Sequence, residues 1–104
     1  MGVRLAVVVV YDISDDALRR RVEKICKSYG LSHVQRSAFI GFLEESERRA
    51  LYSKLSGIIE LEDYPGEASI RIFRMPIAEY KKRYIIGRLK GFDDDPEPEE
   101  VDVV

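Results

Sequence analysis

The stretch VRLAVVVVYD, residues 3–12, decides the fold, because its almost unbroken apolar run predicts one strand at the centre of a sheet. Four consecutive valines favour an extended backbone. The absence of polar alternation indicates a strand that is buried on both faces. We therefore expect a strand over 3–11 that ends at Asp12, the first charged residue after the valines.

A helix is expected directly after this strand. Ser14 is placed to cap its N-terminus, and the acids at positions 15 and 16 favour a helix start. Apolar residues then recur at helical spacing and form one face toward the core; they are Leu18, Val22, Ile25, Cys26 and Tyr29. Gly30 is a suitable residue to end the helix.

The rest of the chain continues the alternation of strands and helices. The pattern predicts strands at 31–35, 37–43 and 68–75, a second helix at 44–55, a loop at 57–66 with a turn at Tyr64, Pro65 and Gly66, and a further strand at 83–89. Residues 77–82 are ambiguous. The order βαββαβ with an extra C-terminal strand predicts an α+β, ferredoxin-like fold, in which two helices cover one face of an antiparallel sheet.

Composition and charge fit one small domain in a chain of 104 residues. Seven acids and no base lie between positions 93 and 102, which leaves 12 acids against 17 bases elsewhere. We expect a domain at 1–91 and a disordered acidic tail at 92–104. A basic body favours a nucleic-acid partner, and a tail that only improves solubility is the alternative.

Nothing in the sequence indicates a membrane or secreted protein. The longest apolar run, Leu5 to Tyr11, is too short to cross a bilayer, and the N-terminus lacks the pattern of a signal peptide. Cys26 is the only cysteine, so it forms no disulfide within the chain. We expect Cys26 to be buried and the protein to be cytoplasmic.

Asp12 is the candidate metal ligand. A carboxylate at the exit of a buried strand lies at the edge of the sheet, near solvent and on a rigid element. Mg²⁺ (or Mn²⁺) takes oxygen ligands and is commonly held by one or two carboxylates with water and phosphate. Two copies of Asp12 across a dimer axis would therefore form a better site than one. The alternative is that Asp12 only orders the turn into the helix.

Two arginines on the predicted helix are candidates for phosphate contacts. Arg19 and Arg21 flank the apolar face on opposite sides, in the turns near the Asp12 end of the sheet. Guanidinium groups bind phosphate through paired hydrogen bonds. The alternative is a solvated basic face in which Arg19 pairs with Glu23.

The connection between the two middle strands carries further candidates. Ser37 can bond a phosphate or a backbone group, and Phe39 can stack on a base or pack in the core, which is the better expectation. His33 is the only histidine, and an imidazole side chain can transfer protons. A surface or edge position explains His33 as well. Motifs for nucleotide-binding loops, zinc or redox chemistry do not occur.

The run VVVVYDISDDALRRRVEKICKSYGLSHVQRSAFIGFL, residues 7–43, resembles the N-terminal half of the Cas2 family of small CRISPR-associated adaptation proteins. The family pattern is an apolar strand ending in Tyr-Asp, a helix with Arg-x-Arg and a final Tyr-Gly, and then Gln-x-Ser-Val-Phe. The matching residues are Tyr11, Asp12, Arg19, Arg21, Tyr29, Gly30, Gln35, Ser37 and Phe39, with Ala38 in place of Val. Residues 69–76 (SIRIFRMP) and 84–87 (YIIG) fit the second half.

This resemblance implies a ferredoxin-like homodimer in which the C-terminal strand, 84–89 here, crosses to the partner's sheet. Family members are described as divalent-metal-dependent nucleases of single-stranded RNA or double-stranded DNA. In adaptation the dimer also bridges the subunits of the CRISPR integrase and holds the incoming duplex. The resemblance makes Asp12 the metal ligand, with Tyr11 beside it as a catalytic residue. It gives supporting, nucleic-acid-binding positions to Arg19, Arg21, Ser37 and Phe39.

Three functions follow as expectations. The first is a Mg²⁺-dependent phosphodiesterase, in which Asp12 of both protomers holds the metal and Arg19 and Arg21 position the backbone. The second is a non-catalytic scaffold that binds duplex DNA and joins integrase subunits, and its binding would survive Asp12→Ala. The third is a toxin-like ribonuclease of the virulence-associated family, which shares the fold. The residues do not choose between RNA and DNA.

Overall fold

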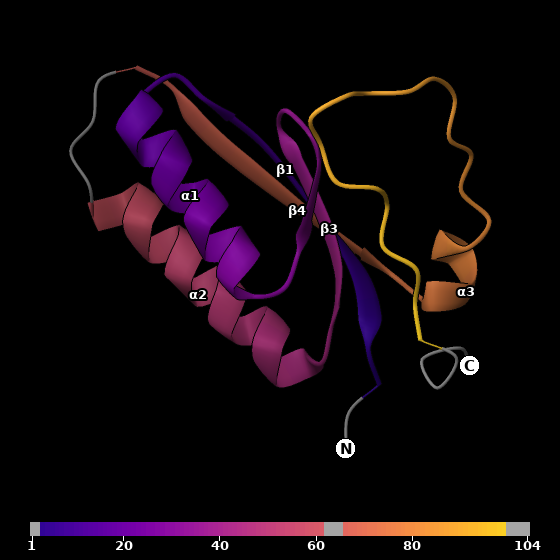
Figure 1. Cartoon of the computed structure of the whole chain (residues 1–104). Helices are drawn as coiled ribbons and strands as arrows, with labels where there is room; N and C mark the ends of the chain where they lie inside the picture. The colour runs from indigo at the N-terminus through magenta and orange to yellow at the C-terminus, as the bar shows by residue number, and fades with distance from the viewer. Residues whose placement is uncertain (1–2, 62–65, 100–104) are drawn as a thin grey trace.

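The computed structural model describes residues 3–61 and 66–99. Its elements are β1 (Leu5–Ile13), α1 (Asp16–Ser28), β2 (Ser32–Gln35), β3 (Ala38–Leu43), α2 (Glu45–Leu61), β4 (Ala68–Met75) and α3 (Ile77–Tyr80). The predicted order βαββαβ is confirmed, and the bounds of β4 are the predicted ones (Figure 1).

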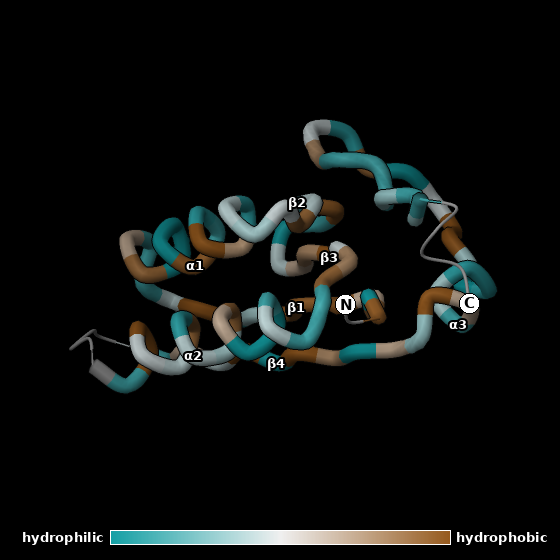
Figure 2. Tube along the Cα trace, turned by 90° about the horizontal axis from the view of Figure 1, so that it is seen from below, coloured by the Kyte–Doolittle hydropathy of each residue, from teal (hydrophilic) through white to brown (hydrophobic). Residues whose placement is uncertain are grey.

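The four strands form one antiparallel sheet in the order β2-β3-β1-β4. β1 lies in the centre, where Val9 pairs with Phe39 of β3 on one side and with Ile72 of β4 on the other. α1 and α2 lie side by side on one face of the sheet (Figures 1 and 2). The predicted ferredoxin-like arrangement is therefore confirmed. In the described ranges, 3–61 and 66–99, each helix is too short or too polar to span a bilayer.

The core lies between the sheet and these two helices. β1 contributes every second side chain, because successive residues of a strand point to opposite faces. The buried members of the core are Val7, Val9, Tyr11, Ile13, Leu18, Val22, Cys26, Leu31, Phe39, Leu43, Leu51 and Leu55. The apolar face predicted for α1 is thus confirmed. Cys26 is buried as expected, and its burial raises the pKa of the thiol to about 12.

The other face of the sheet is largely uncovered in the single chain, and we call it the open face. Its side chains come from the alternate positions of β1, β3 and β4. The prediction that the first strand is buried on both faces is therefore wrong: Val10 of β1 is 39% exposed, and Phe73 of β4 is 52% exposed. Among residues 3–61 and 66–99, the cover described is at one end, where Ile77 and Tyr80 of α3 pack on Ala6 and Phe42.

Asp12 does not end the first strand as predicted. β1 extends to Ile13, and the backbone of Asp12 pairs with Ser69 of β4. The strand continues because β4 is long enough to pair with it as far as Ala68 opposite Ile13. A charged residue is tolerated there because its side chain points to the exposed side of the sheet.

The helix cap also differs from the prediction by one residue. Asp15 is the N-cap of α1, and its carboxylate accepts a hydrogen bond from the Leu18 N–H at 2.8 Å. Ser14 instead bonds to Glu67, donating its own N–H to the Glu67 carbonyl and accepting the Glu67 N–H at its hydroxyl. The approach of the segment before β4 therefore decides which of two suitable capping residues caps the helix.

α2 is longer than predicted, since it continues from Leu55 to Leu61 through a stretch assigned to a loop. Ile58 and Ile59 pack on the core, and this burial supports the helix beyond Gly57, a residue of low helix propensity. The predicted turn residues Tyr64 and Pro65 lie outside the described residues. Gly66 has a φ of 92°, as a turn glycine can.

The C-terminal strand predicted at 83–89 is absent from the described part of this single chain. The ambiguous segment 77–82 begins with the short helix α3, and 84–89 follows as a loop. Tyr84 and Ile86 are 93% and 96% exposed. A strand needs a neighbour for its N–H and C=O groups, and the sheet of this chain does not pair with the segment.

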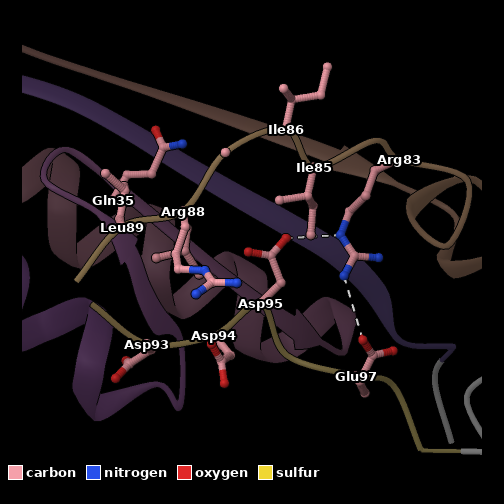
Figure 3. A pocket seen from close by; sticks show the side chains of 12 residues that line it. Gln35, Arg83, Ile85, Ile86, Arg88, Leu89, Asp93, Asp94, Asp95 and Glu97 are labelled. Atoms are coloured by element: carbon pink, nitrogen blue, oxygen red, sulfur yellow. Dashed lines mark hydrogen bonds and ion pairs between the residues drawn. The ribbon is translucent and has the colours of Figure 1, made fainter. Parts of the chain in front are cut away.

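The acidic tail lies against the body as far as the structure describes it, which differs from the disorder expected over 92–99. The Asp93 N–H donates to the His33 carbonyl at 2.9 Å, and the Asp93 carboxylate accepts the His33 N–H at 2.8 Å. Arg83 forms an ion pair with Asp95 at 2.9 Å (Figure 3). The composition of this segment alone is typical of disorder. Charged contacts with residues distant in the sequence hold it against the domain.

Candidate metal and nucleic-acid site

Asp12 lies near the end of β1 on the open face. Strand alternation puts it on the same side as Val8 and Val10, away from the helices, and its side chain is exposed. A rigid, paired strand holds this carboxylate at the solvent. The placement allows Asp12 to meet a metal ion or a substrate that approaches the open face.

Two polar residues of β4 lie beside Asp12 that the sequence reasoning did not assign to the site. Ser69 is directly opposite Asp12, and Arg71 is opposite Val10. The Arg71 guanidinium donates to the Ser69 hydroxyl at 3.0 Å. We call Asp12, Ser69 and Arg71 the open-face patch. The alternation of β4 indicates that Arg71 and Phe73 share a face, but only the pairing register places Arg71 near Asp12.

Tyr11 points to the opposite side of the sheet from Asp12. It is 2% exposed, and its hydroxyl lies 2.7 Å from a carboxylate oxygen of Glu23, 2.8 Å from the Arg36 carbonyl and 3.2 Å from Nε2 of His33. Burial raises the pKa of Tyr11, and the hydrogen bond to Glu23 raises it further. Tyr11 therefore stays protonated and links several elements, and it does not share a pocket with Asp12.

Arg19 lies near the Asp12 end of the sheet, as predicted. Its guanidinium donates to the Ile13 carbonyl at 3.2 Å and forms an ion pair with Asp16. The hydrogen bond to Asp16 raises the pKa of Arg19 above its ordinary value, so the cation is permanent. Among the described ion pairs, Arg19 pairs with Asp16 and not with Glu23, which was the alternative. Glu23 instead accepts a hydrogen bond from the Tyr11 hydroxyl.

Arg21 lies elsewhere. It is exposed and lines a groove of about 540 Å³ between α1 and α2, together with Tyr29 and Lys54. Two positions along a helix rotate a side chain by about 200°, so Arg19 and Arg21 cannot point the same way. The structure therefore divides the predicted phosphate pair between the Asp12 end of the sheet and the surface of the helices.

Phe39 occupies a structural position, whereas the contact given for Ser37 is made by its main chain and leaves the predicted role of its hydroxyl a prediction. The Ser37 carbonyl accepts the Tyr11 N–H at 3.0 Å in the ladder between β1 and β3. Phe39 is completely buried, and its ring stacks on His33 with centroids 4.2 Å apart. Phe39 thus packs in the core, the better of the two expectations, and is not available to stack on a base. His33 lies in the outer strand β2, where the Phe92 ring of the tail packs against it at 89°, with centroids 5.3 Å apart.

One chain offers a divalent metal ion few ligands. Within 3–61 and 66–99 no group of three or more His, Cys, Asp or Glu side chains is arranged to hold a metal ion. Mg²⁺ is commonly bound by only one or two carboxylates, with water and phosphate oxygens completing its shell. Asp12 therefore fits Mg²⁺ when a second carboxylate or a substrate phosphate contributes.

Comparisons with known proteins agree with this fold. A family model described as CRISPR associated protein Cas2 matches residues 5–83, which include the whole open-face patch. The chain is 37% identical over 89 residues to the CRISPR-associated endoribonuclease Cas2 of Korarchaeum cryptofilum, covering 86% of this chain and 91% of that protein. A solved structure described as "Crystal structure of cas2" superposes with a TM-score of 0.66 at 26% identity, covering 90% of this chain and 99% of that one.

One relative has a different organisation. The chain is 33% identical over 74 residues to a protein of Thermoproteus tenax named CRISPR-associated endonuclease Cas1/endonuclease Cas2 fusion. The match covers 71% of this chain and 26% of the fusion. A sequence similar to this one thus occurs in a single polypeptide whose name joins two endonucleases.

Proposed function

This chain belongs to the CRISPR associated protein Cas2 family, and from that premise we propose that it is an endonuclease of spacer acquisition. Its reaction is the hydrolysis of phosphodiester bonds in single-stranded RNA or double-stranded DNA. The curated relative named above as an endoribonuclease supports this class of reaction. The family match also favours this function over a toxin-like ribonuclease of the virulence-associated family.

The observation that carries the proposal is the open-face patch. Asp12 supplies an exposed carboxylate, and Arg71 supplies a cation that is already oriented by its hydrogen bond to Ser69. A carboxylate that can bind a metal ion and a cation that can bind a phosphate thus lie on two paired, rigid strands, β1 and β4. Arg19, held at the same end of the sheet by Ile13 and Asp16, is a second candidate for the phosphate backbone.

We propose that a second copy of the chain completes the site. The exposed apolar residues Val10 and Phe73 lie beside the patch on the open face, and covering them would bury apolar area in a homodimer. A two-fold contact through this face brings the two copies of Asp12 toward each other. The exposed segment 84–89 would then cross to the partner's sheet, as the family resemblance implies, and β4 is the outer strand on which we place it.

The residues of this chain have separate tasks in the proposed reaction. Asp12 of each protomer would hold Mg²⁺ or Mn²⁺, and the metal ion would supply a more acidic water molecule and positive charge beside the phosphate. Arg71 and Arg19 bind and orient the phosphate backbone. Tyr11 fixes the strand that carries Asp12 and exchanges no proton with the substrate, because it lies on the far side of the sheet.

The test is a cleavage assay on labelled single-stranded RNA and double-stranded DNA, with Mg²⁺, with Mn²⁺ and with a chelator. We expect cleavage with metal that is lost in Asp12→Asn, a change that keeps the shape of the side chain. Asp94→Asn is the matched control, since Asp94 is exposed on the tail. Cleavage that persists unchanged in Asp12→Asn would remove Asp12 from the reaction.

A non-catalytic scaffold is the second candidate, and two observations favour it. The described part of one chain holds a single carboxylate at the patch, and the Thermoproteus relative is fused to a Cas1 endonuclease. In this function the homodimer binds duplex DNA and bridges subunits of the integrase. Duplex binding by Asp12→Asn without any cleavage by the parent protein would support the scaffold.

The remaining assignments are proposals of the same standing. We propose that residues 1–91 form the domain and that 92–104 form an acidic appendage. The cytoplasm is the proposed location, in keeping with Cys26 as a buried free thiol.

A further inference from the structure

We propose that the groove between α1 and α2 is a second nucleic-acid site, which holds the sugar-phosphate backbone. The inference rests on the proposed function, because it assigns a further contact surface to the same kind of substrate. The groove has a volume of about 540 Å³, and each helix contributes one cation to its lining, Arg21 from α1 and Lys54 from α2. Ser53 and Tyr29 add hydroxyl groups.

The groove also contains a glycine that packing does not require. Gly57 lies inside α2 without a positive φ, and a Cβ atom at this position would meet no atom within 4 Å. Glycine weakens a helix interior relative to alanine, so neither backbone conformation nor crowding accounts for it. Its missing side chain leaves space beside Lys54, and an open groove is the feature that this residue provides.

The surrounding charge selects an anionic partner with several charges. The first residue of α1, Asp16, is an exposed acid that pairs with Arg19, and the exposed charged side chains after it are four bases, Arg20, Arg21, Lys24 and Lys27. The exposed acids of α2 lie near its two ends, at Glu45, Glu47 and Glu60. A regularly charged backbone fits this surface, because lysine and arginine contacts to phosphates supply most of the affinity for nucleic acid.

The groove and the open-face patch lie on opposite sides of the sheet, since α1 and α2 cover the face that Asp12 does not use (Figures 1 and 2). A nucleic acid held in the groove therefore contacts the protein away from the reacting phosphate. The groove would strengthen binding and guide the strand, and it would leave the rate at saturating substrate unchanged.

The experiment measures binding of a labelled duplex DNA and a labelled single-stranded RNA over a range of salt concentrations. All proteins carry Asp12→Asn, so that no probe is cleaved. The groove variant combines Arg21→Gln with Lys54→Gln. The matched control combines Arg20→Gln with Lys27→Gln, which removes the same charge from exposed helix positions that do not line the groove. Gly57→Leu fills the groove without changing the charge, and circular dichroism verifies that each variant is folded.

We expect the groove variant to bind several-fold more weakly and to lower the slope of log affinity against log salt by about 2, one for each lost phosphate contact. The control should keep most of the affinity, and Gly57→Leu should weaken binding as the groove variant does. Equal losses in the groove and control variants, or full binding by Gly57→Leu, would overturn the groove and leave the proposed function intact. If the protein that carries Asp12→Asn alone and the unchanged protein both bind neither probe, the proposed function fails together with the groove.

Discussion

The two faces of β1 show how adjacent residues acquire different tasks. Tyr11 points into the helix-covered face, where its hydroxyl contacts Glu23 of α1, the Arg36 carbonyl and His33 of β2. Asp12, one residue later, is exposed on the open face. Because a strand alternates its side chains, two neighbours in a sequence motif need not act together in space. Here one neighbour secures the strand and the other presents a carboxylate to solvent.

The largest expected effect compares two aromatic rings, one on each face. We expect Phe39→Ala to lower the free energy of unfolding by about 3–5 kcal/mol, because the ring is completely buried. Phe73→Ala, on the half-exposed open face, should cost about 1 kcal/mol or less in dilute protein. Urea unfolding measures both losses. Equal losses would break the comparison, since they would mean that the open face is packed in the isolated chain.

The next effect compares Tyr11 and Asp12 directly. Tyr11→Phe removes the hydroxyl that lies between Glu23 and the Arg36 carbonyl, so we expect the free energy of unfolding to fall by about 1–3 kcal/mol. Asp12→Asn should change stability by less than about 0.5 kcal/mol, because the side chain is exposed. Thermal unfolding and the cleavage assay are run on both variants. A stable Tyr11→Phe protein without cleavage would place Tyr11 in the chemistry after all.

The two faces should also differ in how they respond to alkaline pH, because the buried thiol of Cys26 lies on the helix-covered face. Cys26 ionises at its ordinary pKa of 9.0 when unfolded and at about 12 when folded, so the unfolded state loses its proton first and stability falls above pH 9. The expected loss is about 1.4 kcal/mol between pH 8 and pH 10. Cys26→Ala should remove this part of the slope in pH-dependent urea unfolding, and Asp12→Asn should not. A slope that Cys26→Ala leaves unchanged would contradict the assignment.

The smallest effect concerns the covered end of the open face. The Arg83 guanidinium lies 3.9 Å from the Tyr80 ring centre and pairs with Asp95, and the Tyr80 hydroxyl donates to the Pro96 carbonyl at 2.7 Å. Arg83→Gln should cost about 1 kcal/mol or less, because the pair is partly solvated. Limited proteolysis should then cut within 92–99 more rapidly. Lys82→Gln is the control, and equal protection of both variants would mean that the ion pair does not hold the tail.

Much of the fold follows from local patterns. The alternation of side chains in β4 and the helical spacing of apolar residues in α1 correctly predict these two elements, because each pattern continues along most of its element. The extension of α2 beyond Leu55 was missed because Gly57 suggested a loop, whereas tertiary burial of Ile58 and Ile59 supports the helix. The choice of Asp15 over Ser14 as the cap likewise depends on a distant segment, the residue Glu67.

The candidate site was only partly predictable. Asp12 follows from its position after an apolar strand, and the expectation that it is accessible agrees with its exposure. Arg71 could not be assigned to the site from the sequence, because the sequence of one strand does not determine the pairing register between β1 and β4. The apolar run of β1 led to the wrong prediction that both of its faces are buried. A sequence shows that a face is apolar, but it does not show whether the same chain covers that face.

The contact between Asp93 and His33 has a consequence for how copies of this chain can assemble. β2 is one outer strand of the sheet, and the tail occupies hydrogen-bonding groups on its free side. β4, the other outer strand, has no neighbour there within the described residues. Open sheet edges are templates on which further chains can polymerise. With one edge obstructed and one available, addition of strands through β4 would stop at a closed pair, because the second edge offers no further template for a fibre.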